Sequence, residues 1–115
     1  MTVNRIQRVN QLIKEKIAQI ILKEADFPVG VLVTVTRVNT SSDLRDSNIF
    51  VSVFPERERV KTVGFLNKKI YNFQGKINKL LRMRPVPRIK FLEEKETVEA
   101  AKIEEILEEL KKEEK

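Results

Sequence analysis

The segment Leu81-Arg82-Met83-Arg84-Pro85-Val86-Pro87-Arg88-Ile89-Lys90-Phe91 joins a long helical pattern to a short strand-like pattern. Proline has no backbone N–H and cannot continue a helix, so its two prolines end the helical pattern at about Arg82. Beyond them, Arg88 to Leu92 alternates polar and apolar residues with the period of two that is typical of a β-strand. Because the helical pattern itself follows a strand-like run, we expect a strand-helix-strand crossover, the connection that parallel neighbours require.

The helical pattern upstream of this segment is too long for one straight helix on a small sheet. From Glu58 to about Arg82, apolar residues recur every three or four positions. They are Val60, Val63, Leu66, Ile70, Phe73, Ile77 and Leu80. A straight helix of ~25 residues would be about 37 Å long, whereas a strand of about seven residues spans roughly 23 Å. We therefore expect a kink between Lys69 and Gly75, because glycine and asparagine are poor helix formers.

Further elements frame the crossover. Residues 5–24 carry isoleucine and valine at helical spacing, whereas Val29–Val38 and Asn48–Phe54 are rich in β-branched residues and are joined by a polar turn. The two runs predict an antiparallel hairpin. A last helix should begin near Thr97 and turn four apolar residues toward the core, namely Ile103, Ile106, Leu107 and Leu110. The fold class is then α+β, one domain over residues 1–115 with helices on one face of a three-stranded sheet and a fraying C-terminus.

Charge is unevenly distributed along the chain. Residues 57–90 contain eleven Lys or Arg and one acid, whereas residues 91–115 contain five Lys and ten Glu. A basic region that persists beside an acidic one favours a polyanionic partner, and we interpret it as a nucleic-acid-binding face. The candidate RNA-binding residues are Arg5, Arg8, Lys68, Lys69, Tyr71, Lys76, Lys79, Arg82, Arg84 and Arg88. Ordinary solvation of helix surfaces is the alternative for the cations of the crossover, and pairing with local acids is the alternative for the first two.

The composition argues against most catalysts. The chain has no Cys and no His, which removes thiolate chemistry and the commonest general base and metal ligands. We expect no cofactor and no metal. Asp43 follows a Ser-Ser turn, and a single loop carboxylate is more often a turn acceptor than a catalyst. No apolar run approaches the ~20 residues needed to span a bilayer, so we expect a cytoplasmic protein.

Several motifs, taken in order, resemble the ribosome-binding factor A family over nearly the whole chain. The first helix shows Arg5-x-x-Arg8-Val9, and the hairpin shows Ser42-Asp43-Leu44 followed by Ile49-Phe50-Val51-Ser52-Val53. The most specific motif is the segment from Leu81 to Phe91, which is similar to the family's Leu-Arg-x-x-Pro-x-Leu-x-Phe entry into its last strand.

This resemblance implies a KH-like fold of the type II order, α-β-β-α-kink-α-β with a C-terminal helix. It also implies a non-enzymatic factor that binds the small ribosomal subunit and its rRNA during late maturation. We expect a monomer that uses neither a membrane nor a small-molecule substrate. In the family the kink carries a small residue, any residue and a glycine. The matching positions here are Lys69-Ile70-Tyr71, which depart from that pattern, and a kink displaced to Gly75 is the alternative.

Other functions remain open on the sequence alone. The charge pattern also suits a generic RNA- or DNA-binding module, or a module whose basic face meets an acidic protein. An enzyme would have to use Asp43 with a lysine or Tyr71. Among the aromatic residues, Tyr71, Phe73 and Phe50 could stack on unpaired bases, although Phe73 falls on the apolar stripe and is expected in the core.

Overall fold

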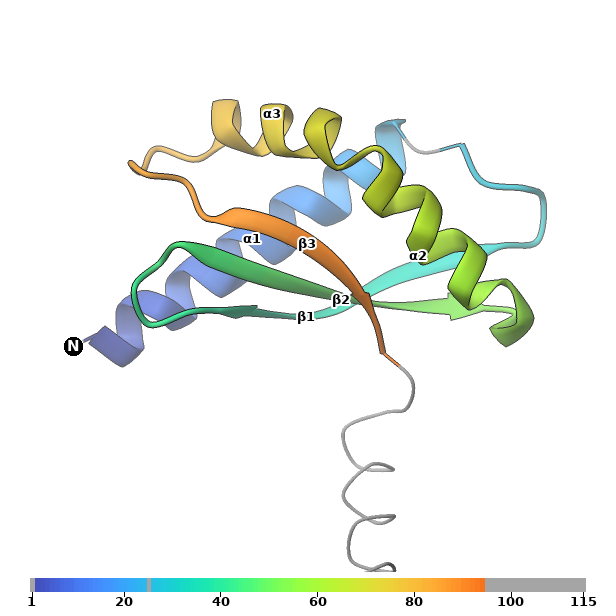
Figure 1. Ribbon diagram of the computed structural model, residues 1–115, viewed down its shortest axis with the longest axis horizontal. Coiled ribbons are helices and arrows are strands. Elements are labelled where there is room, and N and C mark those ends of the chain that lie inside the picture. Colours follow the sequence, from blue (N-terminus) through green and yellow to red (C-terminus); the bar gives the residue numbers. More distant parts are fainter. Residues whose placement is uncertain (1, 25, 95–115) are drawn as a thin grey trace, which may run out of the picture.

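A long helix, a hairpin, two shorter helices and a last strand follow one another in the order that the sequence predicts (Figure 1). The computed structural model describes residues 2–24 and 26–94. The expected helix near Thr97 lies outside these residues. The elements are α1 (Thr2–Glu24), β1 (Leu32–Thr40), β2 (Asp46–Phe54), the 3-10 turn η1 (Glu56–Glu58), α2 (Arg59–Lys68), α3 (Ile70–Leu80) and β3 (Arg88–Glu93). Within the described ranges, no helix is long and apolar enough to cross a membrane.

The sheet has three strands in the order β1-β2-β3. Strands β1 and β2 pair antiparallel, with Leu32 opposite Phe54, and the register shifts by one residue between Val35 and Arg37. Strand β3 pairs parallel to β2, with Ile89 opposite Ser47, so the crossover predicted from the two prolines is confirmed. The fold is α+β with a mixed sheet.

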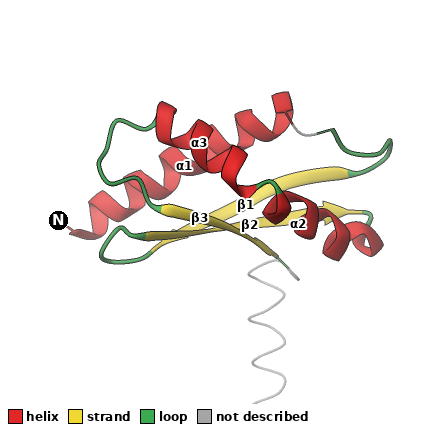
Figure 2. Cartoon of the chain, turned by 45° about the horizontal axis from the view of Figure 1, so that its top comes forward, coloured by secondary structure: helices red, strands yellow, loops and turns green. Residues whose placement is uncertain are grey.

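One face of the sheet carries the core. Alternate residues of β2 and β3 point into it because successive side chains of a strand lie on opposite faces. Helices α1 and α3 lie together on this side of the sheet (Figure 2), and α2 adds Leu66 to the same buried cluster. The residues below 2% exposure include Ile13, Ile17, Ile49, Val51, Leu66, Ile77 and Phe91. Burial of such side chains stabilises the fold by about 1.5–3 kcal/mol each.

The expected kink lies at Lys69, where α2 ends and α3 begins. Lys69 has φ −100° and ψ 21°, outside the α-helical region, and its N–H still donates to the carbonyl oxygens of Phe65 and Leu66. The break lets Leu66 on one side and Phe73 on the other both face the sheet. The alternative at Gly75 is wrong, since Gly75 lies inside α3.

Other boundaries differ from the prediction. Strand β1 begins at Leu32, not Val29, because Pro28 to Val31 forms a turn in which the N–H of Val31 donates to the carbonyl of Pro28 at 3.1 Å. Gly30 has φ +89° in this turn, which a residue with a Cβ rarely adopts. The apolar stripe is also shorter than expected: Val60 is 70% exposed and Leu80 46% exposed. Both lie at the outer ends of their helices, beyond the buried Leu66, Phe73 and Ile77.

Candidate nucleic-acid interface

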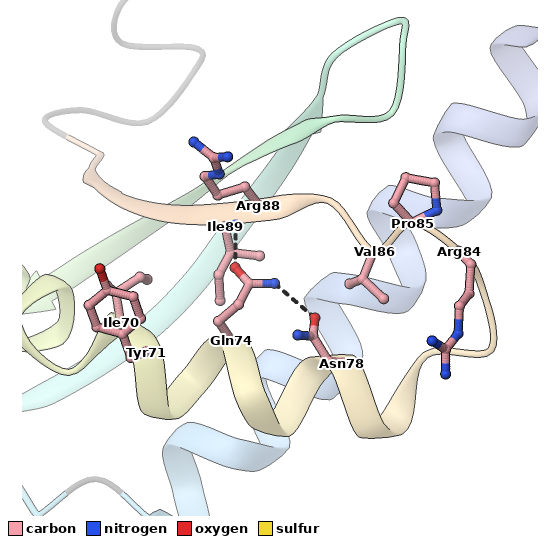
Figure 3. Close-up of a pocket in the computed structure, with 9 residues that line it drawn as sticks. All are labelled: Ile70, Tyr71, Gln74, Asn78, Arg84, Pro85, Val86, Arg88 and Ile89. Atoms are coloured by element: carbon pink, nitrogen blue, oxygen red, sulfur yellow. Dashed lines mark hydrogen bonds between the residues drawn. The ribbon is translucent and has the colours of Figure 1, made fainter.

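An open groove runs between α3 and the segment that leads into β3 (Figure 3). One wall is formed by three residues of α3 that lie three and four positions apart, Tyr71, Gln74 and Asn78. The opposite wall carries Arg84 and Arg88, on either side of Pro85 and Val86. The groove therefore combines one aromatic ring, two amides and the guanidinium group of Arg84, whereas the side chain of Arg88 points away from α3 (Figure 3).

The wall of this groove is fixed by Gln74. Its Oε1 accepts the backbone N–H of Ile89 at 2.9 Å, and its Nε2 donates to the carbonyl of Pro87 and to Oδ1 of Asn78, both at 3.0 Å (Figure 3). Bonds of 2.9–3.0 Å are of ordinary length for N–H···O. The side chain of Gln74 therefore holds α3 and the entry to β3 at a fixed separation.

Asn67 makes the same kind of contact two residues further along β3. Its Nδ2 donates to the carbonyl of Phe91 at 2.8 Å, and its Oδ1 accepts the N–H of Phe91 at 2.9 Å. Strand β3 is at the edge of the described sheet, so these backbone groups have no partner strand. Together, Asn67 and Gln74 satisfy the N–H groups of Ile89 and Phe91 and the carbonyls of Pro87 and Phe91, as buried polar groups require.

A second hollow brings together residues from the two ends of the described chain. Arg5 and Arg8 of α1 meet Arg82, which follows α3, around a floor of Val9, Leu12 and Met83. Three guanidinium groups on an apolar floor suit an anion with several oxygens, because each guanidinium can donate two parallel hydrogen bonds to phosphate. This three-arginine hollow is the most concentrated positive feature among the candidate residues.

Neither the groove nor the hollow is lined by an acidic side chain of the described residues. The acids that do pair lie elsewhere: Arg59 contacts Glu56 at 2.8 Å and Glu93 at 3.4 Å, and Arg37 contacts Glu94 at 3.2 Å. Within the described part of the chain, Arg5 and Arg8 form no ion pair, so pairing with local acids does not account for them. The positive charge of both features is available to a ligand.

The other candidate cations do not line either feature. Lys68 and Lys69 lie at the kink, and the Lys69 ammonium lies 4.9 Å from the ring centre of Phe65. Lys76 and Lys79, three residues apart, share a different side of α3 from the groove residues. The cations thus surround α3 in separate groups and do not form one continuous helical face.

The three aromatic candidates differ in how accessible their rings are. Tyr71 is 90% exposed beside the kink and lines the groove. Phe73 is buried and packs edge-on against Phe91 with ring centres 5.3 Å apart, so its expected place in the core is confirmed. Phe50 is not a free stacking surface, because the guanidinium of Arg37 lies 3.7 Å from its ring centre.

Asp43 is a structural residue of the hairpin loop, as expected. Its Oδ1 accepts the hydroxyl of Ser41 at 2.6 Å and the N–H of Arg45 at 3.1 Å. These hydrogen bonds to the ionised form, the one from Ser41 foremost, hold the pKa of the Asp43 carboxyl below its usual value. A carboxylate engaged in this way is poorly suited to act as a general base.

Sequence reasoning missed Asn67 and Gln74. The available signal was that both are amides on the crossover helices, next to the buried positions Leu66 and Phe73. Such amides can serve a strand edge as well as solvent.

Comparisons with known proteins place this geometry in a family. The family model described as ribosome-binding factor A matches residues 5–107. A ribosome-binding factor A from Thermodesulfovibrio yellowstonii is 35% identical over 108 residues, covering 94% of this chain and 92% of the relative.

Two solved structures are similar as well. The crystal structure of ribosome-binding factor A from Thermus thermophilus matches with a TM-score of 0.66 and 25% identity, over 76% of this chain and 94% of that one. A homology model of the Thermus thermophilus factor, fitted into a cryo-EM map of its complex with the 30S subunit, matches with a TM-score of 0.61 and 26% identity, over 72% of this chain and 88% of that one.

Proposed function

Because the chain belongs to the ribosome-binding factor A family, we propose that it binds the small ribosomal subunit and its rRNA during late maturation, as an assembly factor in the cytoplasm. The family match over residues 5–107 is the observation that carries this proposal. The Thermus thermophilus relative described in complex with the 30S subunit supports the partner.

The three-arginine hollow is proposed to hold backbone phosphate. Arg5, Arg8 and Arg82 lie around it with no acidic neighbour among its lining residues, so a phosphate there would meet three donors and displace condensed counterions. The groove beside α3 is proposed to receive adjacent rRNA, with Arg84 at the backbone and Tyr71 against an unpaired base. Such contacts fix position and shape and do not read sequence.

A binding role is proposed in place of a catalytic one. The Asp43 carboxylate is engaged in hydrogen bonds within its own loop. The residues that line the groove include amides, arginines and a tyrosine, with no carboxylate among them. These groups can bind and orient a polyanion. They do not form the pair of a nucleophile and a base that acyl or phosphoryl transfer needs.

The test has two parts. In the first, an extract is sedimented, and the chain should travel with free small subunits and not with complete ribosomes. Binding to purified subunits is then compared with binding to duplex DNA at equal salt. Equal affinity for both would contradict the proposal and favour a generic nucleic-acid module.

The second part concerns the hollow. The triple variant Arg5→Gln, Arg8→Gln, Arg82→Gln should weaken binding and reduce the slope of log affinity against log salt by about 0.7, the value for one lost phosphate contact in single strands. The matched control is Lys23→Gln, an exposed cation in the last turn of α1. An unchanged salt slope in the triple variant would remove the hollow from the interface.

A further inference from the structure

The outer face of the sheet, opposite the core, is open in the described part of the chain (Figures 1 and 2). Toward one end it is apolar: Leu32 and Phe54 are directly opposite each other and are 64% and 70% exposed. The next part of this face carries Phe50 beside Leu92, both half-buried. Toward the other end it is polar, with Lys90 beside Asn48 and Arg88 beside the acidic Asp46. An exposed apolar patch of this kind marks an interaction surface.

The side chain of Glu94, the last described residue, lies on this face. The N–H of Glu94 still pairs with the carbonyl of Val51 at 2.8 Å, as a continuation of β3. Its carboxylate, however, reaches β1, where it accepts Nε of Arg37 at 3.2 Å and the hydroxyl of Thr36 at 3.4 Å. Because Arg37 covers the outward-facing ring of Phe50, this contact lies on the outer face, and the Glu94 side chain is only 10% exposed there.

The sequence that follows Glu94 complements what it would meet. Residues 95–115 contain eight Glu and five Lys, a net charge opposite in sign to that of the exposed Lys90. They also carry four apolar residues at helical spacing, Ile103, Ile106, Leu107 and Leu110. A helix over residues 97–110 would be about 21 Å long, within the roughly 30 Å of a nine-residue strand.

We propose that the C-terminal segment, residues 97–110, docks intramolecularly on the outer face of the sheet. Its apolar side chains cover Leu32, Phe54 and Leu92, and its glutamates face Lys90. The covalent link favours this occupant over a second copy of the chain, because a short tether holds the segment at an effective concentration in the millimolar range. The sheet would then be covered on both faces, with the basic hollow and the groove left free.

The absence of cysteine makes the test direct, since one introduced thiol is the only one in the protein. Thr34 is exposed on the outer face of β1, opposite Ser52, and Lys79 is exposed on α3. The rate of thiol modification is measured for Thr34→Cys in the full chain, with and without Ile106→Asp and Leu110→Asp. Ser52→Cys serves as a second reporter on the same face, and Lys79→Cys reports on the helical side.

We expect the outer-face thiol to react about tenfold more slowly in the otherwise unchanged chain than in the aspartate variant, because a face covered in about nine-tenths of molecules reacts only in the remaining tenth. The thiol at position 79 should react equally in both. The control Lys102→Gln with Lys112→Gln makes the same change in net charge, leaves the apolar residues in place and should retain the protection. If the thiols at positions 34 and 52 each react at the same rate with and without the two aspartate substitutions, the proposal is overturned. Protection that grows with protein concentration would also overturn it, in favour of a second copy.

Discussion

Asn67 offers the sharpest test of how the groove is built. Replacing it with alanine removes both hydrogen bonds to Phe91, at 2.8 and 2.9 Å, and leaves that N–H and carbonyl without a partner in a half-buried position. Each such bond contributes about 0.5–1.5 kcal/mol net, so the loss should be about 1–3 kcal/mol of unfolding free energy. In a domain of this size that corresponds to a fall in Tm of about 4–8 °C per kcal/mol.

The matched control for this change is Asn72→Ala. Asn72 also lies in a helix of the crossover, but it is exposed and makes no side-chain hydrogen bond to the described residues. Both changes gain the same intrinsic helix propensity, so the difference between the two variants isolates the edge contact. The assay is urea unfolding followed by circular dichroism. If the unfolding free energies of the two variants agree within about 0.5 kcal/mol, water replaces the hydrogen bonds of the Asn67 amide fully and the edge contact does not stabilise the fold.

Three further changes test other parts of the structure. Tyr71→Ala should change the unfolding free energy by less than about 0.5 kcal/mol and weaken single-stranded RNA binding by about 1–3 kcal/mol. Phe73→Ala should instead lower the unfolding free energy by about 3–5 kcal/mol. Urea unfolding and RNA titration distinguish the two variants, and a destabilised Tyr71 variant would refute the exposed position of Tyr71. Gly75→Ala should stabilise the protein by about 0.5–1 kcal/mol, since a Cβ there meets no atom within 4 Å, and a loss of stability would contradict an unbroken α3. Because folding lowers the pKa of Asp43, its contribution to stability is complete above the unfolded value of about 3.9 and is lost as the pH falls through the folded value. Asp43→Asn should therefore reduce the acid dependence of unfolding, and an identical pH profile would speak against it.

The elements of the fold follow from local patterns, so the sequence was sufficient to predict most of them. Ile13 and Ile17 lie four residues apart on the apolar side of α1, and this side faces the core. The two prolines prevent the helix before them from extending further. The kink follows from length alone. Its exact residue does not, because Leu66 and Phe73 fix it by packing on the sheet, and Gly75 is tolerated inside α3.

The site was predictable in its residues but not in its grouping. Arg5 and Arg82 are nearly the whole described chain apart, and they meet only because α1 packs beside α3 in one particular register. No periodicity in the sequence indicates how two distant helices pack against each other. The same holds for Asn67 and Gln74, whose amides gain a role only when β3 lies alongside the crossover helices.

The amide contacts along β3 also bear on self-assembly. An unpaired strand edge is a template onto which another molecule can add a strand, and sheets that grow in this way aggregate. Here Asn67 and Gln74 already bond four backbone groups along this edge, the N–H groups of Ile89 and Phe91 and the carbonyls of Pro87 and Phe91. At the other edge of the described sheet, the one-residue irregularity of β1 between Val35 and Arg37 disturbs the regular ladder that such addition requires.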